Sequence, residues 1–308
     1  WFRTSYLLDS RQTDPDLARE RFLNYSGHVL RYNLNGFRGT YRSLGISPLR
    51  RKKSGIRAAV IREKGTNGDR EMAYALYLAG FDVRDVHMTD LTEGRETLKD
   101  INMLVFAGGS TNSDVFGAAK GWAGAFLYNR TAAETLENYY KRKDTLSLGV
   151  CNGCQLMAEL GLIYPDHGKK PRLMQNKSGK FESAFLGVHI TGNNSVMLAD
   201  MAGMELGIWM AHSEGCFDLP YDEEKYMIPV KYSHNTYPAN PSGSDYNAAA
   251  ICSADGRHLA MMLHPERSIF PWQCAYYPHY KKYDEVTPWI KAFVNARKWI
   301  ESEPHEHM

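Results

Sequence analysis

The sequence predicts an α/β domain whose doubly wound, mainly parallel sheet is flanked by helices, with extra β-hairpins in the second half. The first reason is that buried strand-like runs alternate with amphipathic helical stretches as far as residue 163. The second is that residues 183–266 hold closely spaced strand-like runs with an Asp-Gly turn signal. The length of 308 residues allows one such domain together with an extension.

The first half alternates strands and helices in an order typical of a parallel sheet. Strands are expected at residues 55–62, 81–88, 102–109 and 145–150. Residues 65–81 should form a turn, a helix and a glycine stop, because Met72 and Leu76 recur at helical spacing before Gly80. Further helices are expected at residues 114–129, 131–143 and 152–163.

The second half is expected to add strands and a closing helix. Strands are predicted at residues 183–191, 206–215 and 226–233, and a hairpin at 248–266. The closing helix at 287–301 should have Thr287 as its cap and Pro288 at its first position. It presents one apolar face that should pack on the sheet, made of Ile290, Phe293, Ala296 and Ile300.

Residues 1–55 show no sustained period of either kind, so we expect a linker or extension there. The domain proper is expected at residues 56–302, followed by a tail at 303–308. Because the first residue is Trp rather than Met, we expect the chain to be a piece of a longer polypeptide. The extension would then be ordered only against the missing part.

The composition limits the classes of partner. The apolar fraction of 43% and the charged fraction of 23% are ordinary for a globular protein. A net charge of +2 predicts no strong attraction to nucleic acid or to a membrane surface. An odd count of five cysteines suits a reducing compartment, so we expect a cytoplasmic protein. The sequence shows neither a signal peptide nor an apolar run of about 20 residues.

Cys151 and Cys154 form a C-x-x-C pair, which admits three interpretations. A structural zinc site needs four ligands, but the other cysteines stand alone and only His212 beside Cys216 could be recruited. A thioredoxin-like redox pair would follow the first strand, whereas this pair follows the fourth and no Trp precedes it. The third interpretation is that Cys151 is a nucleophile.

Cys151 ends a strand-like run and directly precedes a helix, with Gly149 and Gly153 on either side. This G-x-C-x-G pattern is typical of a nucleophile elbow, where a sharp turn requires flanking glycines. The helix dipole favours the thiolate, and the N–H of Asn152 can stabilise an oxyanion. Cys154 would pack one turn into the helix. A purely structural turn with a buried cysteine remains an alternative.

A cysteine nucleophile needs a base, and His264 is the best candidate among eleven histidines. It ends a strand-like run and is followed by Pro265 and Glu266. A histidine there can present its imidazole to the thiolate while the nearby carboxylate orients the ring.

These residues carry a resemblance to a known family. The pattern of Gly149, Cys151, Gly153 and Gln155 with a distant His-Pro-Glu resembles the class I, or triad, glutamine amidotransferases, which have a flavodoxin-like fold. The ordered set "IREKGTNGDREMA", "DVHMTDL", "GWAGAFLYN", "GVCNGCQLM", "AHSEG", "TYPANPSGS" and "MLHPERS" resembles the glutaminase domains of the phosphoribosylformylglycinamidine synthase family, from purine biosynthesis. The resemblance covers roughly residues 56–301.

The resemblance implies a mechanism. Cys151 would attack the side-chain amide of L-glutamine, releasing ammonia and leaving a γ-glutamyl thioester that water hydrolyses. His264 would move protons and Glu266 would hold it. Ammonia would pass to an ATP-dependent synthase domain of the same polypeptide. No cofactor is expected in this chain; ATP and magnesium belong to that synthase part, and no G-x-x-x-x-G-K-[ST] loop occurs here.

The resemblance also implies the remaining site residues. The oxyanion hole would use the N–H groups of Gly109 and Asn152. Substrate contacts would come from Gly108, Gln155, His212 and Glu214.

The sequence departs from the family pattern at two places. Ser110 and Thr111 stand where a bulky aromatic residue and Ser are usual, which could loosen the oxyanion loop. Ser213 stands where Gly is usual, which restricts the backbone. A stand-alone α/β cysteine hydrolase of the peptidase or deglycase type stays open as an alternative, as does a non-enzymatic redox module using Cys151 and Cys154.

Overall fold

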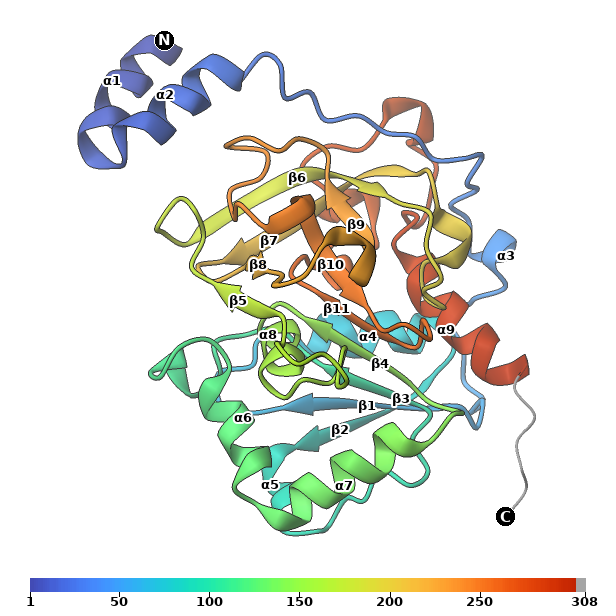
Figure 1. Cartoon of the computed structure of the whole chain (residues 1–308). Helices are drawn as coiled ribbons and strands as arrows, with labels where there is room; N and C mark the ends of the chain where they lie inside the picture. Colours follow the sequence, from blue (N-terminus) through green and yellow to red (C-terminus); the bar gives the residue numbers. More distant parts are fainter. Residues whose placement is uncertain (303–308) are drawn as a thin grey trace.

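The computed structural model describes residues 1–302, and the expected tail at 303–308 lies outside them. Within these residues one large sheet contains the strands β1 (Arg57–Arg62), β2 (Asp82–His87), β3 (Met103–Phe106), β4 (Leu146–Val150), β6 (Glu182–Ile190), β7 (Glu205–His212), β9 (Met227–Tyr232), β10 (Ala248–Cys252) and β11 (His258–Met261). Their spatial order is β2-β1-β3-β4-β11-β10-β9-β6-β7 (Figure 1). A second, small sheet pairs β5 (Arg172–Met174) with β8 (Cys216–Asp218).

The large sheet has a parallel part and an antiparallel part. β2, β1, β3, β4 and β11 run parallel to one another. From β11 onward the neighbours β10, β9, β6 and β7 are antiparallel. The doubly wound α/β sheet predicted from the sequence is confirmed. The extra hairpins expected in the second half are also present, as the antiparallel pairs β6–β7 and β10–β11, and they extend the same sheet.

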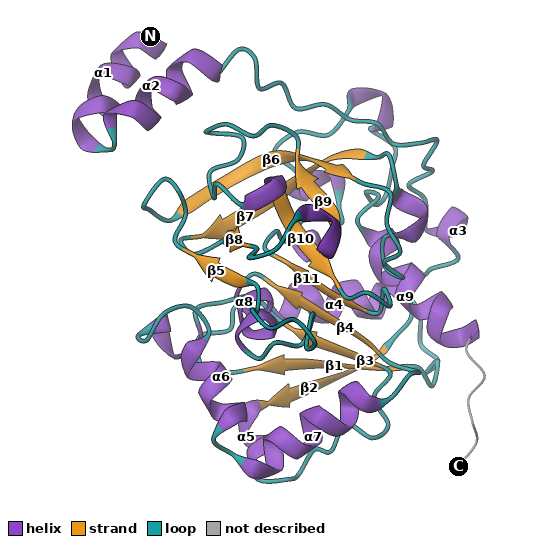
Figure 2. Ribbon diagram, viewed as in Figure 1, coloured by secondary structure: helices purple, strands orange, loops and turns teal. Residues whose placement is uncertain are grey.

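Helices cover both faces of the parallel part (Figure 2). They are α4 (Asp69–Ala79), α5 (Met88–Thr92), α6 (Lys120–Leu127), α7 (Arg130–Lys141), α8 (Asn152–Glu159) and α9 (Ile290–Ser302). α4 packs against α9 on one face, and α6 contacts α7 and α8 on the other. The predicted apolar face of α9 is buried, although the helix begins at Ile290 rather than beside Thr287. Among the described residues no helix is both long and apolar enough to cross a bilayer.

The strand order places a crevice at the carboxyl ends of β1 and β3. The chain passes from β1 through α4 to β2 on one side, then returns to β3 on the other side of β1. In open α/β sheets this reversal separates two connections and leaves room for a ligand. The antiparallel part curves back to the same place, because Trp209 of β7 forms an isolated bridge with His264, just after β11.

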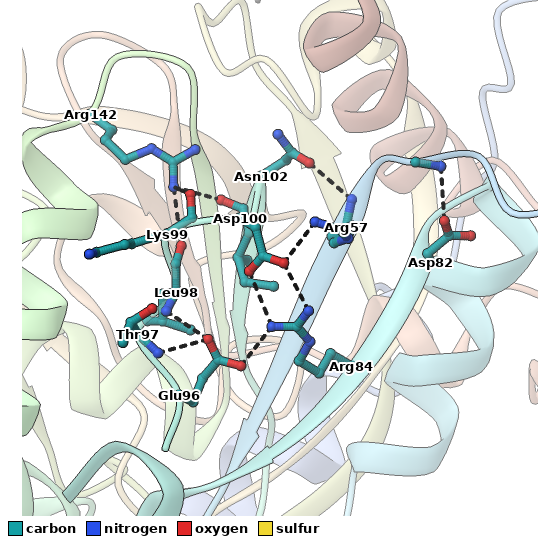
Figure 3. A network of polar contacts seen from close by, with 12 residues as sticks. Arg57, Asp82, Arg84, Glu96, Thr97, Leu98, Lys99, Asp100, Asn102 and Arg142 are labelled. Atoms are coloured by element: carbon teal, nitrogen blue, oxygen red, sulfur yellow. Dashed lines mark hydrogen bonds and ion pairs between the residues drawn. The ribbon is translucent and has the colours of Figure 1, made fainter. Parts of the chain in front are cut away.

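A polar network fixes the opposite end of β3 (Figure 3). Arg84 donates to Glu96 at 2.7 Å and to Asp100 at 2.9 and 3.1 Å, while Arg57 donates to Asp100 at 2.7 Å. The side chain of Asn102 accepts the N–H of Arg57 at 2.9 Å. Exposed ion pairs add little individually to the stability of a fold. The contacts of Arg57 with Asp100 and Asn102 instead fix the register of β3 against β1.

The extension contains helices that the sequence analysis missed: α1 (Phe2–Gln12), α2 (Pro15–Asn24) and the short α3 (Tyr41–Leu44). Asp14 caps α2 by accepting the N–H groups of Asp16 and Leu17 at 2.9 and 3.0 Å. The signal was present, since Asp followed by Pro is a typical helix start. The period was obscured because α1 and α2 bury little and pack mainly through Phe2 and Phe22, whose ring centroids lie 5.6 Å apart. Both helices lie at one edge of the domain (Figure 1), and α2 contacts its body, because Asn24 Nδ2 donates to the carbonyl oxygen of Tyr237 at 2.9 Å.

The helix predicted at 114–129 is wrong in its first part. α6 begins only at Lys120, after a segment in which Asn112, Ser113, Asp114 and Ala119 have φ values of 50°, 58°, 47° and 59°. Left-handed residues cannot continue a right-handed helix. The start of this segment is held by hydrogen bonds between the side chain of Asn152 and the residues Thr111 and Asp114.

Candidate active site

Cys151 lies at the sharp turn between β4 and α8. Its φ and ψ are 53° and −110°, a conformation that non-glycine residues rarely adopt. The flanking glycines are required by close contact. A Cβ on Gly149 would lie 2.5 Å from the carbonyl oxygen of Gly153, and one on Gly153 would lie 2.0 Å from that of Phe106. The predicted elbow is therefore formed, with α8 seated directly on β3.

The contact at Gly153 predicts a large loss of stability. Gly153→Ala should destabilise the fold by about 3 kcal/mol or more, because the blocking atom is backbone and cannot rotate away. Chemical denaturation followed by circular dichroism measures the change. Gly192→Ala is the matched control, since a Cβ there meets nothing within 4 Å. Equal stabilities of the two variants would show that α8 is not seated on β3 as described.

The two cysteines of the C-x-x-C pair lie in different environments. Cys151 is the N-cap residue of α8, and its Sγ donates to the carbonyl oxygen of Ala211 at 3.5 Å. Cys154 is fully buried, and burial, with the neighbouring Cys151, raises the pKa of its thiol well above the usual value. Both are free thiols. Cys154 therefore packs in the interior one turn into α8, as expected from the sequence, and is not the reactive thiol of the pair.

The structure also bears on the interpretation of the cysteine pair as part of a structural zinc site, which needs four ligands. Within residues 1–302 no three His, Cys, Asp or Glu side chains are grouped closely enough to hold a metal ion.

His264 and Glu266 form a buried pair. His264 Nδ1 lies 2.7 Å from Glu266 Oε1, and both residues are 1% exposed. Pro265 starts a short 3-10 turn that folds the carboxylate back onto the ring. Burial alone would lower the pKa of His264, but the charge of Glu266 and the nearby Cys151 thiol together raise it to about 10. Glu266 therefore orients the imidazole and stabilises its protonated form.

The structure brings His264 to the elbow. A Cβ on Gly108 would lie 2.9 Å from His264 Cε1 and 3.4 Å from Cys151 Cβ, so both side chains converge on this glycine. His264 Nε2 has no hydrogen-bond partner among the described residues. With Nδ1 engaged by Glu266, Nε2 is the atom left to exchange a proton with the thiol. A side chain at Gly108 would separate the ring of His264 from Cys151.

The Gly108-Gly109 turn is held by the loop after β1. The carbonyl oxygen of Gly108 accepts the N–H groups of Asn67 and Gly68 at 3.0 and 3.1 Å. Gly109 bridges Thr66, and a Cβ on Gly109 would lie 2.4 Å from the carbonyl oxygen of Gly65. The N–H of Gly109 donates to no acceptor in the part of the chain that the structure describes. It is thus available to a ligand, as an oxyanion donor must be.

A cleft of about 180 Å³ opens beside these groups. This is smaller than the roughly 300–1,000 Å³ of sites for drug-sized ligands, and suits a small metabolite. Its lining consists of Asn67, Gly109, Ser110, Asp114, Ala118, Cys151, Gln155, Phe181, Ala211, His212, Ser213, His264 and Arg267. Of the predicted substrate contacts, Gln155 and His212 are in this lining, whereas Gly108 and Glu214 are not.

Gln155 and Glu214 lie together but are engaged with the protein. Gln155 Nε2 donates to the carbonyl oxygen of Glu214 at 2.5 Å, and its Oε1 accepts from Asn152 Nδ2 at 2.9 Å. The carboxylate of Glu214 accepts the N–H of Ala118 at 3.1 Å. These side chains shape the cleft wall by holding the segment before α6.

His212 is buried, and its tautomer is fixed by a residue that the sequence analysis missed. His212 Nδ1 lies 3.0 Å from Asn176 Oδ1, while Asn176 Nδ2 donates to the carbonyl oxygen of His212 at 2.7 Å. Burial, with the neighbouring His264, lowers the pKa of His212 to about 3, so its ring stays neutral. Its Nε2 has no partner among the described residues. Ser213 brings no strain, since its φ is not positive.

Comparison with known proteins decides the family. Residues 55–300 match the family model described as the CobB/CobQ-like glutamine amidotransferase domain. The chain belongs to this family. The match covers every residue of the predicted site, including the elbow, the His264–Glu266 pair and the Gly108-Gly109 turn.

Curated relatives of this amidotransferase domain are much longer proteins. The chain is 40% identical over 328 residues to a probable phosphoribosylformylglycinamidine synthase, chloroplastic/mitochondrial, of Arabidopsis thaliana, covering 98% of this chain and 23% of that protein. It is 38% identical to the phosphoribosylformylglycinamidine synthase of Homo sapiens, covering 97% of this chain and 24% of that protein. The chain thus spans about a quarter of the length of these relatives.

A solved structure shares the fold. The structure of PurLQS from Thermotoga maritima matches with a TM-score of 0.61 and 23% identity, covering 80% of this chain and 99% of that chain. The amidotransferase fold, with its mixed and mostly parallel sheet flanked by helices, is thereby shown independently of the sequence relatives.

Proposed function

We propose that this amidotransferase domain hydrolyses L-glutamine and supplies the ammonia to an ATP-dependent synthase, as the glutaminase part of a phosphoribosylformylglycinamidine synthase in purine biosynthesis. The observation that carries the proposal is the elbow itself. Cys151 stands at positive φ at the start of α8, beside a buried His264–Glu266 pair joined at 2.7 Å. That arrangement suits acyl transfer through a thioester.

The steps follow from the positions of the groups. His264 Nε2 takes the thiol proton, and Cys151 Sγ attacks the δ-carbonyl carbon of glutamine. The carbonyl oxygen becomes an oxyanion that accepts hydrogen bonds from the N–H groups of Gly109 and Asn152. The C–N bond breaks, and His264 returns the proton to the departing nitrogen, giving ammonia and a γ-glutamyl thioester. Water, deprotonated by His264, then releases glutamate and restores the thiol.

The substrate contacts are proposed from the cleft. His212 carries its ring hydrogen on Nδ1, which faces Asn176 Oδ1, so Nε2 is a neutral acceptor for an N–H group of glutamine. Gln155 lines the same cleft. Gly108 and Glu214 lie outside this lining, so we propose that they affect the substrate indirectly, by positioning the residues that line the cleft.

The synthase part is proposed as the partner, on the same polypeptide. The lengths of the relatives support a synthase part on the same polypeptide or as a partner. ATP and magnesium would bind in that part and not in this chain. We propose a cytoplasmic location on cysteine usage alone, noting that the name of the Arabidopsis relative carries the words chloroplastic/mitochondrial.

Product analysis tests the proposal. The chain should be incubated with L-glutamine, with glutamate and ammonia measured enzymatically and the intact protein mass recorded after rapid acid quenching. We expect equimolar glutamate and ammonia, together with a γ-glutamyl adduct on the protein. Absence of both products and adduct would contradict the proposed function.

A further inference from the structure

The segment that follows Gly109 is held in an unfavourable backbone conformation. Asn112, Ser113 and Asp114 are consecutive non-glycine residues with positive φ. Each costs free energy, because Cβ approaches the carbonyl oxygen in the left-handed region, and such residues persist only where surrounding contacts impose them. Residues 110–114, here called the oxyanion loop, must therefore be fastened from outside.

One buried side chain supplies that fastening. Asn152 is 0% exposed. Its Oδ1 accepts the N–H of Thr111 at 3.1 Å and the hydroxyl of Thr111 at 2.6 Å. Its Nδ2 donates to Asp114 Oδ1 at 3.1 Å and to Gln155 Oε1 at 2.9 Å. All four hydrogen-bonding positions of the amide are occupied, three of them by the oxyanion loop.

The other contacts of the loop do not reach the elbow. The N–H groups of Ser110 and Asn112 donate to the carbonyl oxygens of Gly65 and Lys64 at 3.0 and 2.8 Å, in the loop after β1. Asp114 Oδ1 also accepts the N–H of Ala119 at 3.0 Å, within the same segment. Among the side chains described, that of Asn152, the residue after Cys151, connects the loop directly to the elbow.

We propose that the Asn152 side chain is a positioning residue, which locks the oxyanion loop onto the elbow so that the Gly109 N–H and the Asn152 N–H face one oxyanion. The inference rests on the proposed function. It also explains how the loop is ordered without an aromatic residue after Gly109, because the Thr111 hydroxyl provides the shortest contact to Asn152.

The inference predicts a selective loss of turnover. The oxyanion charge develops only on the way to the tetrahedral intermediate, so a misplaced donor lowers kcat far more than it raises KM. Asn152→Ala should reduce kcat for glutamine hydrolysis by about 10²-fold, comparable to losing one oxyanion donor. Thr111→Val, which keeps the shape and removes the hydroxyl, should lower kcat in the same direction by less.

The experiment separates acylation from thiol reactivity. Steady-state glutamine hydrolysis is measured beside the rate of Cys151 alkylation by iodoacetamide, a displacement that forms no oxyanion. The control is Thr191→Val, which removes a hydroxyl bonded to the carbonyl oxygen of Ile228 at 2.7 Å in the antiparallel part of the sheet. We expect lower kcat with unchanged alkylation in the Asn152 and Thr111 variants, and wild-type behaviour in the control.

Three results would count against the inference. Unchanged kcat in Thr111→Val and Asn152→Ala would overturn it, as would alkylation rates that fall in proportion to kcat. If Asn152→Ala does not fold, Thr111→Val decides alone. If the wild-type chain forms no glutamate while its thiol is alkylated normally, the proposed function fails and this inference falls with it.

Discussion

Replacement of Cys151 by alanine is expected to abolish glutamine hydrolysis and leave the fold intact. Alanine removes the nucleophile and the thioester intermediate, so the rate should fall by at least about 10⁴-fold. The fold should persist, because the volume lost is small and the elbow is held by the contacts of Gly149 and Gly153. Glutamate release and the thermal unfolding midpoint are the two measurements.

The neighbouring cysteine provides the control for this prediction. Cys154 lies one turn into α8, fully buried and away from the cleft lining. Cys154→Ala should keep glutamine hydrolysis near the wild-type rate, apart from a modest loss of stability from the cavity. Full activity in Cys151→Ala, or equal losses in both variants, would return the alternatives of a redox module or another hydrolase.

The second large effect is expected for Glu266→Gln. The carboxylate stabilises protonated His264 at 2.7 Å, and glutamine keeps the shape but removes the charge. We expect kcat/KM to fall by about 10²–10⁴-fold, the range for impaired general acid–base catalysis. Glu223→Gln is the matched control, since it neutralises a surface carboxylate paired with Lys231.

The pH profile of Glu266→Gln should change in a defined direction. In the wild-type chain Glu266 and Cys151 raise the pKa of His264 to about 10 against the effect of burial. Without the negative charge, burial dominates and the pKa falls, so the imidazole loses its proton at lower pH. The alkaline limb of the pH profile of kcat/KM should therefore shift toward lower pH. An unshifted limb would contradict the assigned role of Glu266.

Much of this site could be predicted from the sequence because its geometry is local. The elbow requires glycines at fixed spacing around Cys151, and the turn after β11 places a carboxylate two residues from His264. Parallel strands bring their carboxyl ends to one edge, which explains why the Gly108-Gly109 turn and the elbow meet. The spacing of these residues along the chain therefore determines their relative positions in the site.

The remaining features depend on contacts that sequence spacing does not encode. Asn176 reaches His212 from a loop far along the chain, and β7 returns to His264 through the curvature of the sheet. The start of α6 was misplaced because Asp114 and Ala119 have positive φ, and the contact of Asp114 with Asn152 is not visible in the sequence spacing. The helices of the extension bury few side chains, so their apolar period was weak.

Labelling by an electrophilic glutamine analogue tests the central claim most directly. The chain is treated with the analogue in the presence and absence of excess L-glutamine, and the adduct is mapped by peptide mass spectrometry. The account predicts a single adduct at Cys151 that glutamine prevents, since the nucleophile and the glutamine pocket share one cleft. Labelling at Cys154, or equal labelling of several cysteines that glutamine does not affect, would contradict it.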